Sequence, residues 1–191
     1  MNRIEFIKPV YDLKEIPKRV LPTVVLCGRS NVGKSSFINS LFNTKIAQTS
    51  SQPGKTRSIN YYLVEEKFYI ADLPGFGYAK VSKSERDSWQ QLLEKYFSIN
   101  KQIQLAFHLV DSRHAPMQLD ITLNEFLRSQ DIPYVVLLSK SDKLKQSELA
   151  QSKIQVKKTF PEVLFGENCF FYSTIKGTGQ KEVSKLLSSL F

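Results

Sequence analysis

Residues 28–35 of the chain read GRSNVGKS, which matches the pattern G-x-x-x-x-G-K-[ST] of a phosphate-binding loop. The apolar run TVVLC at residues 23–27 precedes the motif, and a stretch with helical spacing follows it. In a strand, loop and helix of this kind, the backbone N–H groups of the loop and the helix N-terminus face a phosphate chain. The motif therefore predicts that Lys34 reaches the β- and γ-phosphates of a nucleotide and that the Ser35 hydroxyl binds Mg²⁺.

Along the rest of the chain, short runs rich in β-forming residues alternate with stretches of helical period. Parallel strands need crossover connections, so this alternation indicates a mostly parallel sheet with helices on both faces. The clearest helix signal starts at Ser82, an N-cap candidate with Glu85 as its capping-box partner. We predict a three-layer α/β fold with six strands, at residues 23–27, 59–64, 68–71, 105–110, 134–138 and 169–172, and helices at residues 34–42, 82–97, 119–127, 145–160 and 183–191.

The composition of the 191 residues, 41% hydrophobic and 24% charged, is typical of one globular domain and excludes a mainly disordered chain. The longest unbroken apolar run, YVVLL at residues 134–138, is far shorter than the roughly 20 residues of a membrane-spanning helix. The N-terminus lacks the apolar core of a signal peptide, so we expect a cytoplasmic protein with no membrane partner. Cys27 and Cys169 lie in apolar runs without a CxxC motif, which predicts reduced core residues.

The charge of the chain is less ordinary, because 27 Lys and Arg oppose 18 Asp and Glu and give a formal net charge of +9. Such an excess favours a polyanionic partner, although a basic surface that is merely solvated is the alternative. Between Glu15 and Glu65 the sequence has no acidic residue, and the bases there include those of the phosphate-binding loop. An anion is therefore expected beside this stretch.

Two motifs further along the chain narrow the class of nucleotide-binding protein. Asp72, Leu73, Pro74 and Gly75 close a predicted strand, where the aspartate can hold Mg²⁺ through water and the glycine amide can sense a γ-phosphate. Ser139, Lys140, Ser141 and Asp142 follow the buried YVVLL strand. A carboxylate at Asp142 that accepts two N–H bonds from guanine would select guanine over adenine, which lacks the same donors. Together the motifs favour a GTPase over a P-loop ATPase or kinase.

At this point the sequence resembles a known family. The stretches GRSNVGKSSFIN, TSSQPGKTRSINYY, DLPGFGYAKVSKSER, HLVDSRHAPM and SKSDK are similar to those of the EngB (YihA/YsxC) group of bacterial ribosome-biogenesis GTPases, in the TrmE-Era-EngA-YihA-septin-like class. The resemblance runs from about Leu21 to the C-terminus. It implies a Ras-like G domain at residues 23–191, with an N-terminal extension at residues 1–22 packed on it.

The resemblance implies roles for the residues that bind the phosphates and the metal ion. Thr56 corresponds to the switch threonine that completes the Mg²⁺ site when GTP is bound, together with Ser35 and Asp72. Gly54 and Lys55 belong to the same switch segment, and Asp72 and Gly75 would report the γ-phosphate, with Leu73 and Pro74 between them also among the implied nucleotide-binding residues. The residues implied for wrapping the phosphates are Gly28, Arg29, Ser30, Asn31, Val32, Gly33, Lys34, Ser35 and Ser36.

The base would lie between the motif at residues 139–142 and the stretch Tyr172, Ser173 and Thr174, which backs guanine through its main chain. Two positions depart from the usual family pattern. Ser139 stands where asparagine or threonine is usual, and Thr174 stands where a smaller residue is common, so whether nucleotide affinity is altered stays open. The residues implied for catalysis are Lys34, Asn31, Thr56 and Gly75.

Phe76 follows Gly75 where many G proteins place a glutamine that orients the attacking water. A phenylalanine ring cannot make that hydrogen bond, so we expect slow intrinsic hydrolysis. Asn31 occupies the position that helps to bind K⁺ in potassium-activated relatives, which suggests that K⁺, a ribosomal group or both complete the site. The alternative is that Asn31 only stabilises its own loop.

The leading hypothesis is a GTP-hydrolysing switch that binds GTP or GDP with Mg²⁺ and assists assembly of the large ribosomal subunit. Its partners would be that subunit or its precursor and ribosomal RNA, and the free protein would be a monomer. Family resemblance also implies a need for the protein in normal cell division. One alternative is a GTP-dependent binding module in septation with incidental hydrolysis, and a P-loop ATPase or kinase is another. The role of the stretch at residues 111–114, DSRH, stays open.

Overall fold

A computed structural model describes residues 3–48, 58–76 and 83–191. In these residues, the strands are hydrogen-bonded in the order β1-β3-β4-β2-β5-β6-β7. Their bounds are β1 Ile4–Val10, β2 Thr23–Gly28, β3 Ile59–Val64, β4 Phe68–Asp72, β5 Ile103–Asp111, β6 Tyr134–Ser139 and β7 Cys169–Phe171. The α-helices are α1 Lys34–Leu41, α2 Lys83–Ile99, α3 Gln118–Ser129, α4 Gln146–Thr159 and α5 Gln180–Leu190, with short 3₁₀ helices at Leu13–Glu15 and Ser141–Lys143.

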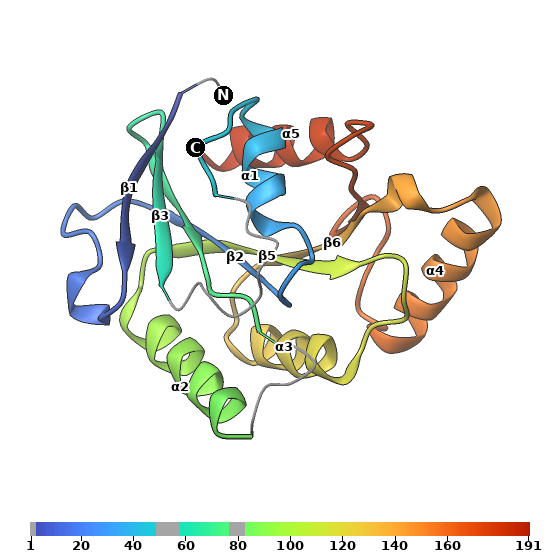
Figure 1. Cartoon of the computed structure of the whole chain (residues 1–191), viewed down its shortest axis with the longest axis horizontal. Helices are drawn as coiled ribbons and strands as arrows, with labels where there is room; N and C mark the ends of the chain where they lie inside the picture. Colours follow the sequence, from blue (N-terminus) through green and yellow to red (C-terminus); the bar gives the residue numbers. More distant parts are fainter. Residues whose placement is uncertain (1–2, 49–57, 77–82) are drawn as a thin grey trace.

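Helices cover both faces of the sheet, as predicted (Figure 1). Successive side chains of a strand point to opposite faces, so Val24 and Leu26 of β2 pack with α1 and α5, whereas Val25 and Cys27 pack with α2 and α3. A third cluster places Val156 of α4 against β6. All strand pairs from β4 through β2, β5 and β6 to β7 are parallel, which confirms the mostly parallel α/β fold.

The predicted number of six strands is wrong for the described sheet, because β1 adds a seventh strand antiparallel to β3. This strand, IEFIKPV, is an edge strand with several exposed residues and a register shift between Phe6 and Lys8. Edge strands tolerate charged residues and proline, and β1 contains both, including Pro9. These residues interrupt the apolar run by which a strand is recognised in a sequence. The boundary between an extension and a G domain at residues 22 and 23 stays a prediction.

The five predicted helices are confirmed within one to a few residues of their ends, including α4, whose sequence is polar. Ser82 and the side chain of Glu85, predicted to cap α2, lie outside the described residues. Cys27 and Cys169 are buried and free, as expected. Within the part of the chain that the structure describes, no helix is long and apolar enough to cross a membrane.

Candidate functional site

The phosphate-binding motif forms the turn between β2 and α1, at the carboxyl edge of the parallel strands. Residues 28–33 make the turn, and Lys34, Ser35 and Ser36 begin α1. Gly28 has a φ of 149°, and a Cβ there would lie 2.5 Å from the Leu109 carbonyl oxygen of β5. Only glycine fits so close to the neighbouring strand, so the sheet itself fixes where the loop starts.

The side chain of Arg29 extends from this loop toward α3. Its guanidinium Nη1 lies 3.7 Å from Oδ2 of Asp120 in the first turn of α3, and the Asp120 side chain is only 3% exposed. This contact joins the loop to α3. With its side chain directed to Asp120, Arg29 would take part in the predicted phosphate wrapping through its backbone.

Lys34 and Asp72 are the charged residues at the predicted phosphate and metal end of the site. Lys34 Nζ donates to the Gly28 carbonyl over 3.2 Å, and burial lowers the pKa of Lys34 while Asp72 opposes that change. Burial raises the pKa of Asp72 to about 6, an effect that the positive charge of Lys34 reduces. Among residues 3–48, 58–76 and 83–191, no hydrogen-bond donor reaches Oδ1 of Asp72.

A buried carboxylate with an unpartnered oxygen is a ligand type that suits Mg²⁺, and Ser35 adds a hydroxyl in the first turn of α1, directly after the phosphate-binding loop. Ser35 and Asp72 therefore fit the metal site implied by the sequence. The other residues implied there, Gly54, Lys55 and Thr56, lie outside the described residues.

The segment Asp72 to Gly75 lies directly on the phosphate-binding loop. A Cβ on Gly75 would lie 2.9 Å from the Ser30 Cα and 3.0 Å from Lys34 Nζ. The Phe76 carbonyl accepts a hydrogen bond of 2.8 Å from the Ser30 amide. A displacement of Gly75 would therefore change its contacts with the phosphate-binding loop. Glycine is needed at this position because a side chain would collide with the loop.

The predicted guanine motif is attached to the same loop from the other side. Lys140 Nζ donates to the Asn31 carbonyl over 2.6 Å, and Ser139 Oγ donates to the Val32 carbonyl over 2.7 Å. The Ser139 hydroxyl therefore braces the loop despite its departure from the usual residue. The Ser141 amide donates to the Tyr172 carbonyl over 3.2 Å, which joins the motif to the segment after β7.

The Ser173 side chain orients Asp142, whereas the family resemblance implies only a main-chain role for Ser173. Ser173 Oγ donates to Asp142 Oδ1 over 2.8 Å and accepts the amides of Ile175 and Lys176 over 3.2 and 3.0 Å. The hydroxyl is therefore fully committed and its proton points at the carboxylate. Thr174 is exposed, and within the described part of the chain it makes no hydrogen bond to Asp142.

Trp89 on α2 is a further residue whose role the motifs did not indicate. Its indole Nε1 donates to the Pro74 carbonyl over 3.0 Å, and its ring packs against Phe76 with the ring centroids 3.8 Å apart and the ring planes tilted by 32°. The helical period of the sequence predicts only that Trp89 lies on the buried face of its helix. The structure shows that it joins α2 to the segment that touches the phosphate-binding loop.

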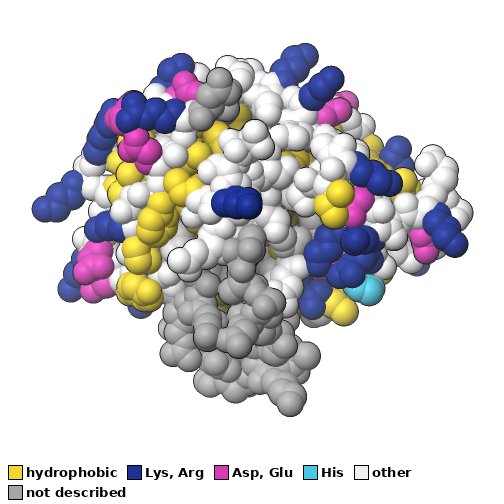
Figure 2. Space-filling view, turned by 45° about the horizontal axis from the view of Figure 1, so that its top comes forward, with side chains coloured by type: hydrophobic (Ala, Val, Ile, Leu, Met, Phe, Trp, Pro, Cys, Tyr) yellow, Lys and Arg dark blue, Asp and Glu magenta, His cyan; other side chains and the backbone are white. Residues whose placement is uncertain are grey.

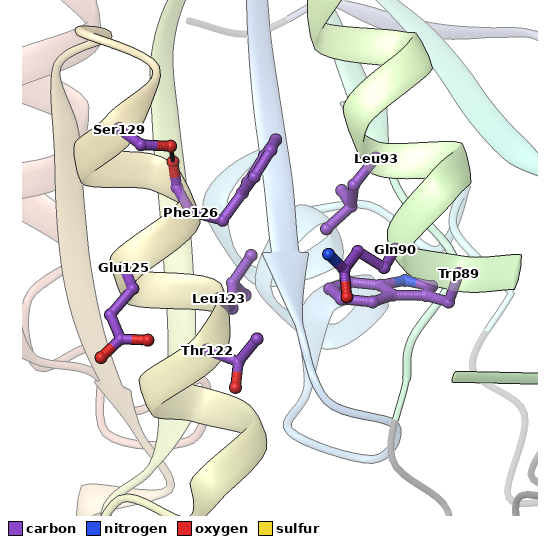
Figure 3. Close-up of a pocket in the computed structure, with 8 residues that line it drawn as sticks. All are labelled: Trp89, Gln90, Leu93, Thr122, Leu123, Glu125, Phe126 and Ser129. Carbon is purple, nitrogen blue, oxygen red and sulfur yellow. Dashed lines mark hydrogen bonds between the residues drawn. The ribbon is translucent and has the colours of Figure 1, made fainter. Parts of the chain in front are cut away.

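Beside Trp89, α2 and α3 enclose a small groove of about 260 Å³. Figure 3 shows Trp89 and Leu93 of α2 facing Leu123 and Phe126 of α3 across it. The remaining lining residues, on the two helices, are Gln90, Thr122, Glu125 and Ser129.

Comparison with known proteins agrees with this geometry. Residues 23–140 match the model of a family described as 50S ribosome-binding GTPases. A probable GTP-binding protein EngB of Thermotoga maritima is 44% identical over 188 residues, covering 98% of this chain and 95% of the relative. The chain belongs to the EngB family.

A second EngB relative, from Petrotoga mobilis, is 41% identical over 189 residues and also covers 98% of this chain and 95% of its own. The crystal structure of a probable GTP-binding protein EngB has a TM-score of 0.72 at 26% identity, covering 87% of this chain and 97% of that one. The Aquifex aeolicus Era structure, with a TM-score of 0.67 at 22% identity over 88% of this chain and 56% of that chain, shares the fold.

Membership of the EngB family makes this chain a GTP-binding protein and a GTPase. The ATPase or kinase weighed from the phosphate-binding loop alone is therefore not supported. Which individual side chains contact the nucleotide stays a prediction from the motifs, to which the contacts above give a consistent geometry.

Proposed function

We propose that this EngB protein is a slow, Mg²⁺-dependent GTP switch of the cytoplasm that assists assembly of the large ribosomal subunit. One observation carries the switch: Gly75 and Phe76 contact the phosphate-binding loop while the neighbouring Pro74 and the same Phe76 contact Trp89 of α2. A γ-phosphate that moves Gly75 would therefore also move the contacts of α2. Nucleotide state then changes the surface around α2, which a partner can recognise.

Slow hydrolysis follows from Phe76. Phe76 is 6% exposed and packs against Trp89, and a phenyl ring cannot orient an attacking water. Another group must then stabilise the charge that develops on the phosphates. We assign this part to K⁺ near Asn31 or to a group of the ribosome.

The donor set described above would hold Mg²⁺ through Ser35 and Asp72, with Thr56 implied as a further ligand. When bound, the metal neutralises charge on the β- and γ-phosphates. Lys34 would add a positive charge at the same phosphates, and Asp142 would select guanine through its oriented carboxylate.

The ribosomal partner is supported by the description of the matching family and by the charge of the chain. The net charge of +9 exceeds what a nucleotide with Mg²⁺ can balance, since that complex carries only about two negative charges. Lys and Arg side chains are spread over the face shown in Figure 2, with Asp and Glu in smaller groups. Such a surface favours contacts with the phosphates of ribosomal RNA.

Hydrolysis rates in matched K⁺ and Na⁺ buffers, with and without large ribosomal subunits, test this function. We expect slow turnover in Na⁺ alone and faster turnover when K⁺, subunits or both are added. Fast hydrolysis in Na⁺ without a partner would contradict the assignment. Failure of large ribosomal subunits to bind in either nucleotide state would favour the septation module with incidental hydrolysis.

A further inference from the structure

Asp111, the last residue of β5, lies beside the guanine motif although it is far from that motif in the sequence. It pairs with Ser139 across the parallel ladder of β5 and β6. Asp111 Oδ2 accepts a hydrogen bond of 2.8 Å from Lys140 Nζ, the same ammonium that donates to the Asn31 carbonyl. Lys140 is therefore held at its charged end by a carboxylate on one strand and by the phosphate-binding loop.

Arg113 fixes the orientation of that carboxylate. Its Nε donates to Asp111 Oδ1 over 2.9 Å, its Nη2 donates to Oδ2 over 2.8 Å, and its backbone amide donates to Oδ1 over 3.1 Å. A bidentate arginine–carboxylate interaction of this kind fixes the plane of the carboxylate as well as its position. Burial alone would raise the pKa of Asp111, but hydrogen bonds from Arg113 and Lys140 outweigh it and hold that pKa well below its usual range.

Ser112 attaches the same segment to the backbone of the guanine motif. Its amide and its hydroxyl both donate to the Ser139 carbonyl, over 3.0 and 2.6 Å, and the residue is 3% exposed. Residues 111–113 thus contact the motif at two successive positions, the Ser139 backbone and the Lys140 side chain.

The backbone conformation and the flexible side chain of Lys140 explain why contacts with neighbouring residues are needed to hold its ammonium in place. Its backbone has a φ of 61°, in the left-handed region, and its side chain ends in a point charge on a flexible stem. A lysine that packs its stem on a base loses that freedom on binding. A side chain already held in place loses less of it, so the nucleotide binds more tightly.

We propose that Asp111, fixed by Arg113, positions the Lys140 ammonium and thereby sets how long a guanine nucleotide stays bound. The inference rests on the assignment of Lys140 to the guanine site. It gives the DSRH stretch a role that its sequence alone did not indicate: Asp111 and Arg113 are positioning residues that act through Lys140.

A double-mutant cycle tests this role. Release of mant-GDP is followed by stopped flow for the full-length protein and for Asp111→Ala, Lys140→Ala and the double variant. Loss of a hydrogen bond between charged groups predicts that Asp111→Ala releases the nucleotide about ten- to a hundredfold faster. In the Lys140→Ala background, the same substitution should add nothing, because the group it acts on is gone. Independent, multiplying effects would overturn the proposal.

Further variants separate positioning from a loss of folding. Asp111→Asn keeps the shape of the side chain and Arg113→Ala removes only its support, so both should accelerate release, by less than Asp111→Ala. Arg128→Ala is the matched control. Arg128 lies in the last turn of α3, is exposed and, like Arg113, is close to a carboxylate, that of Glu162. It should release mant-GDP at the wild-type rate.

The outcomes also distinguish the inference from the assignment beneath it. If Lys140→Ala itself leaves release unchanged, the assignment of Lys140 to guanine is wrong and the proposal falls with it. If Lys140→Ala accelerates release but both Asp111 variants behave as wild type, the guanine site stands and only the positioning role is overturned.

Discussion

At the scale of single residues, the site works by holding charged side chains in place before a ligand arrives. The Ser173 hydroxyl donates a hydrogen bond to Asp142, and the Lys140 ammonium donates to both Asp111 and the Asn31 carbonyl. The sequence motifs predict which residue types bind the base and the phosphates. They do not predict these supports, because Asp111 and Lys140 are 29 residues apart and meet only when two parallel strands pair.

Replacement of Asp142 by asparagine tests the choice of base. An amide cannot accept both N–H donors of guanine, so Asp142→Asn should bind GDP about a hundredfold more weakly. The same amide can donate to the oxygen that xanthine carries in place of the amino group. Competition of GDP and XDP for the site measures both effects, and the gain of XDP binding shows that the variant is folded. Unchanged preference for GDP would remove Asp142 from the guanine site.

His108 on β5 is a buried titratable group outside the nucleotide site. Burial lowers its pKa from 6.5 to about 4, and the neighbouring Asn124 side chain and the charge of Glu162 offset part of that change. The unfolded chain takes up a proton on this histidine below about pH 6.5, whereas the folded chain does so only near pH 4. The folded state should therefore lose stability between these pH values, by up to about 3 kcal/mol.

Urea unfolding of wild type and His108→Gln at pH 7.5, 6, 5 and 4 checks this expectation. The variant has its own stability at neutral pH, so the quantity compared is the fall in the free energy of unfolding with acid. That fall should be smaller in His108→Gln than in wild type. His114→Gln is the matched control, because His114 is the exposed histidine of the chain. An equal fall in all three proteins would show that His108 does not couple to pH.

At the scale of elements, the sequence predicts the strands that are buried on both faces and misses β1, one of the two edge strands. The central strands carry uninterrupted apolar runs such as TVVLC and YVVLL, whereas β1 mixes apolar residues with Glu5, Lys8 and Pro9. Burial on both faces demands a continuous apolar run, but an edge strand needs apolar residues only where it packs. The helical period of α4 is also weak in the sequence, because Ser152 and Val156 are its buried residues and the rest of the helix is more exposed.

Helix α2 is joined to the nucleotide site by Trp89, and the chain has one tryptophan. Its fluorescence should therefore change when GDP is exchanged for a non-hydrolysable GTP analogue, because contact of Gly75 with the γ-phosphate alters the environment that Pro74 and Phe76 give the indole. Gly75→Ala should remove the difference, since a Cβ there collides with Ser30. Identical emission spectra in the two states of the wild type would contradict the proposed coupling.

At the scale of the whole molecule, the sheet gathers motifs from distant parts of the sequence at its carboxyl edge. The phosphate-binding loop follows β2, the γ-phosphate segment follows β4 and the guanine motif follows β6. In the proposed function, α2 would respond to the γ-phosphate through Trp89, and the positive charge of the chain would supply affinity for RNA phosphates. Together these features support our proposal of a basic protein whose binding surface depends on its nucleotide.

The most direct test of this account is co-sedimentation with purified large ribosomal subunits over a series of salt concentrations, in GDP and in a non-hydrolysable GTP analogue. We predict stronger binding with the GTP analogue than with GDP, and a steep loss of affinity with salt in both states. Binding that is the same with either nucleotide and insensitive to salt would contradict a nucleotide-controlled electrostatic interface.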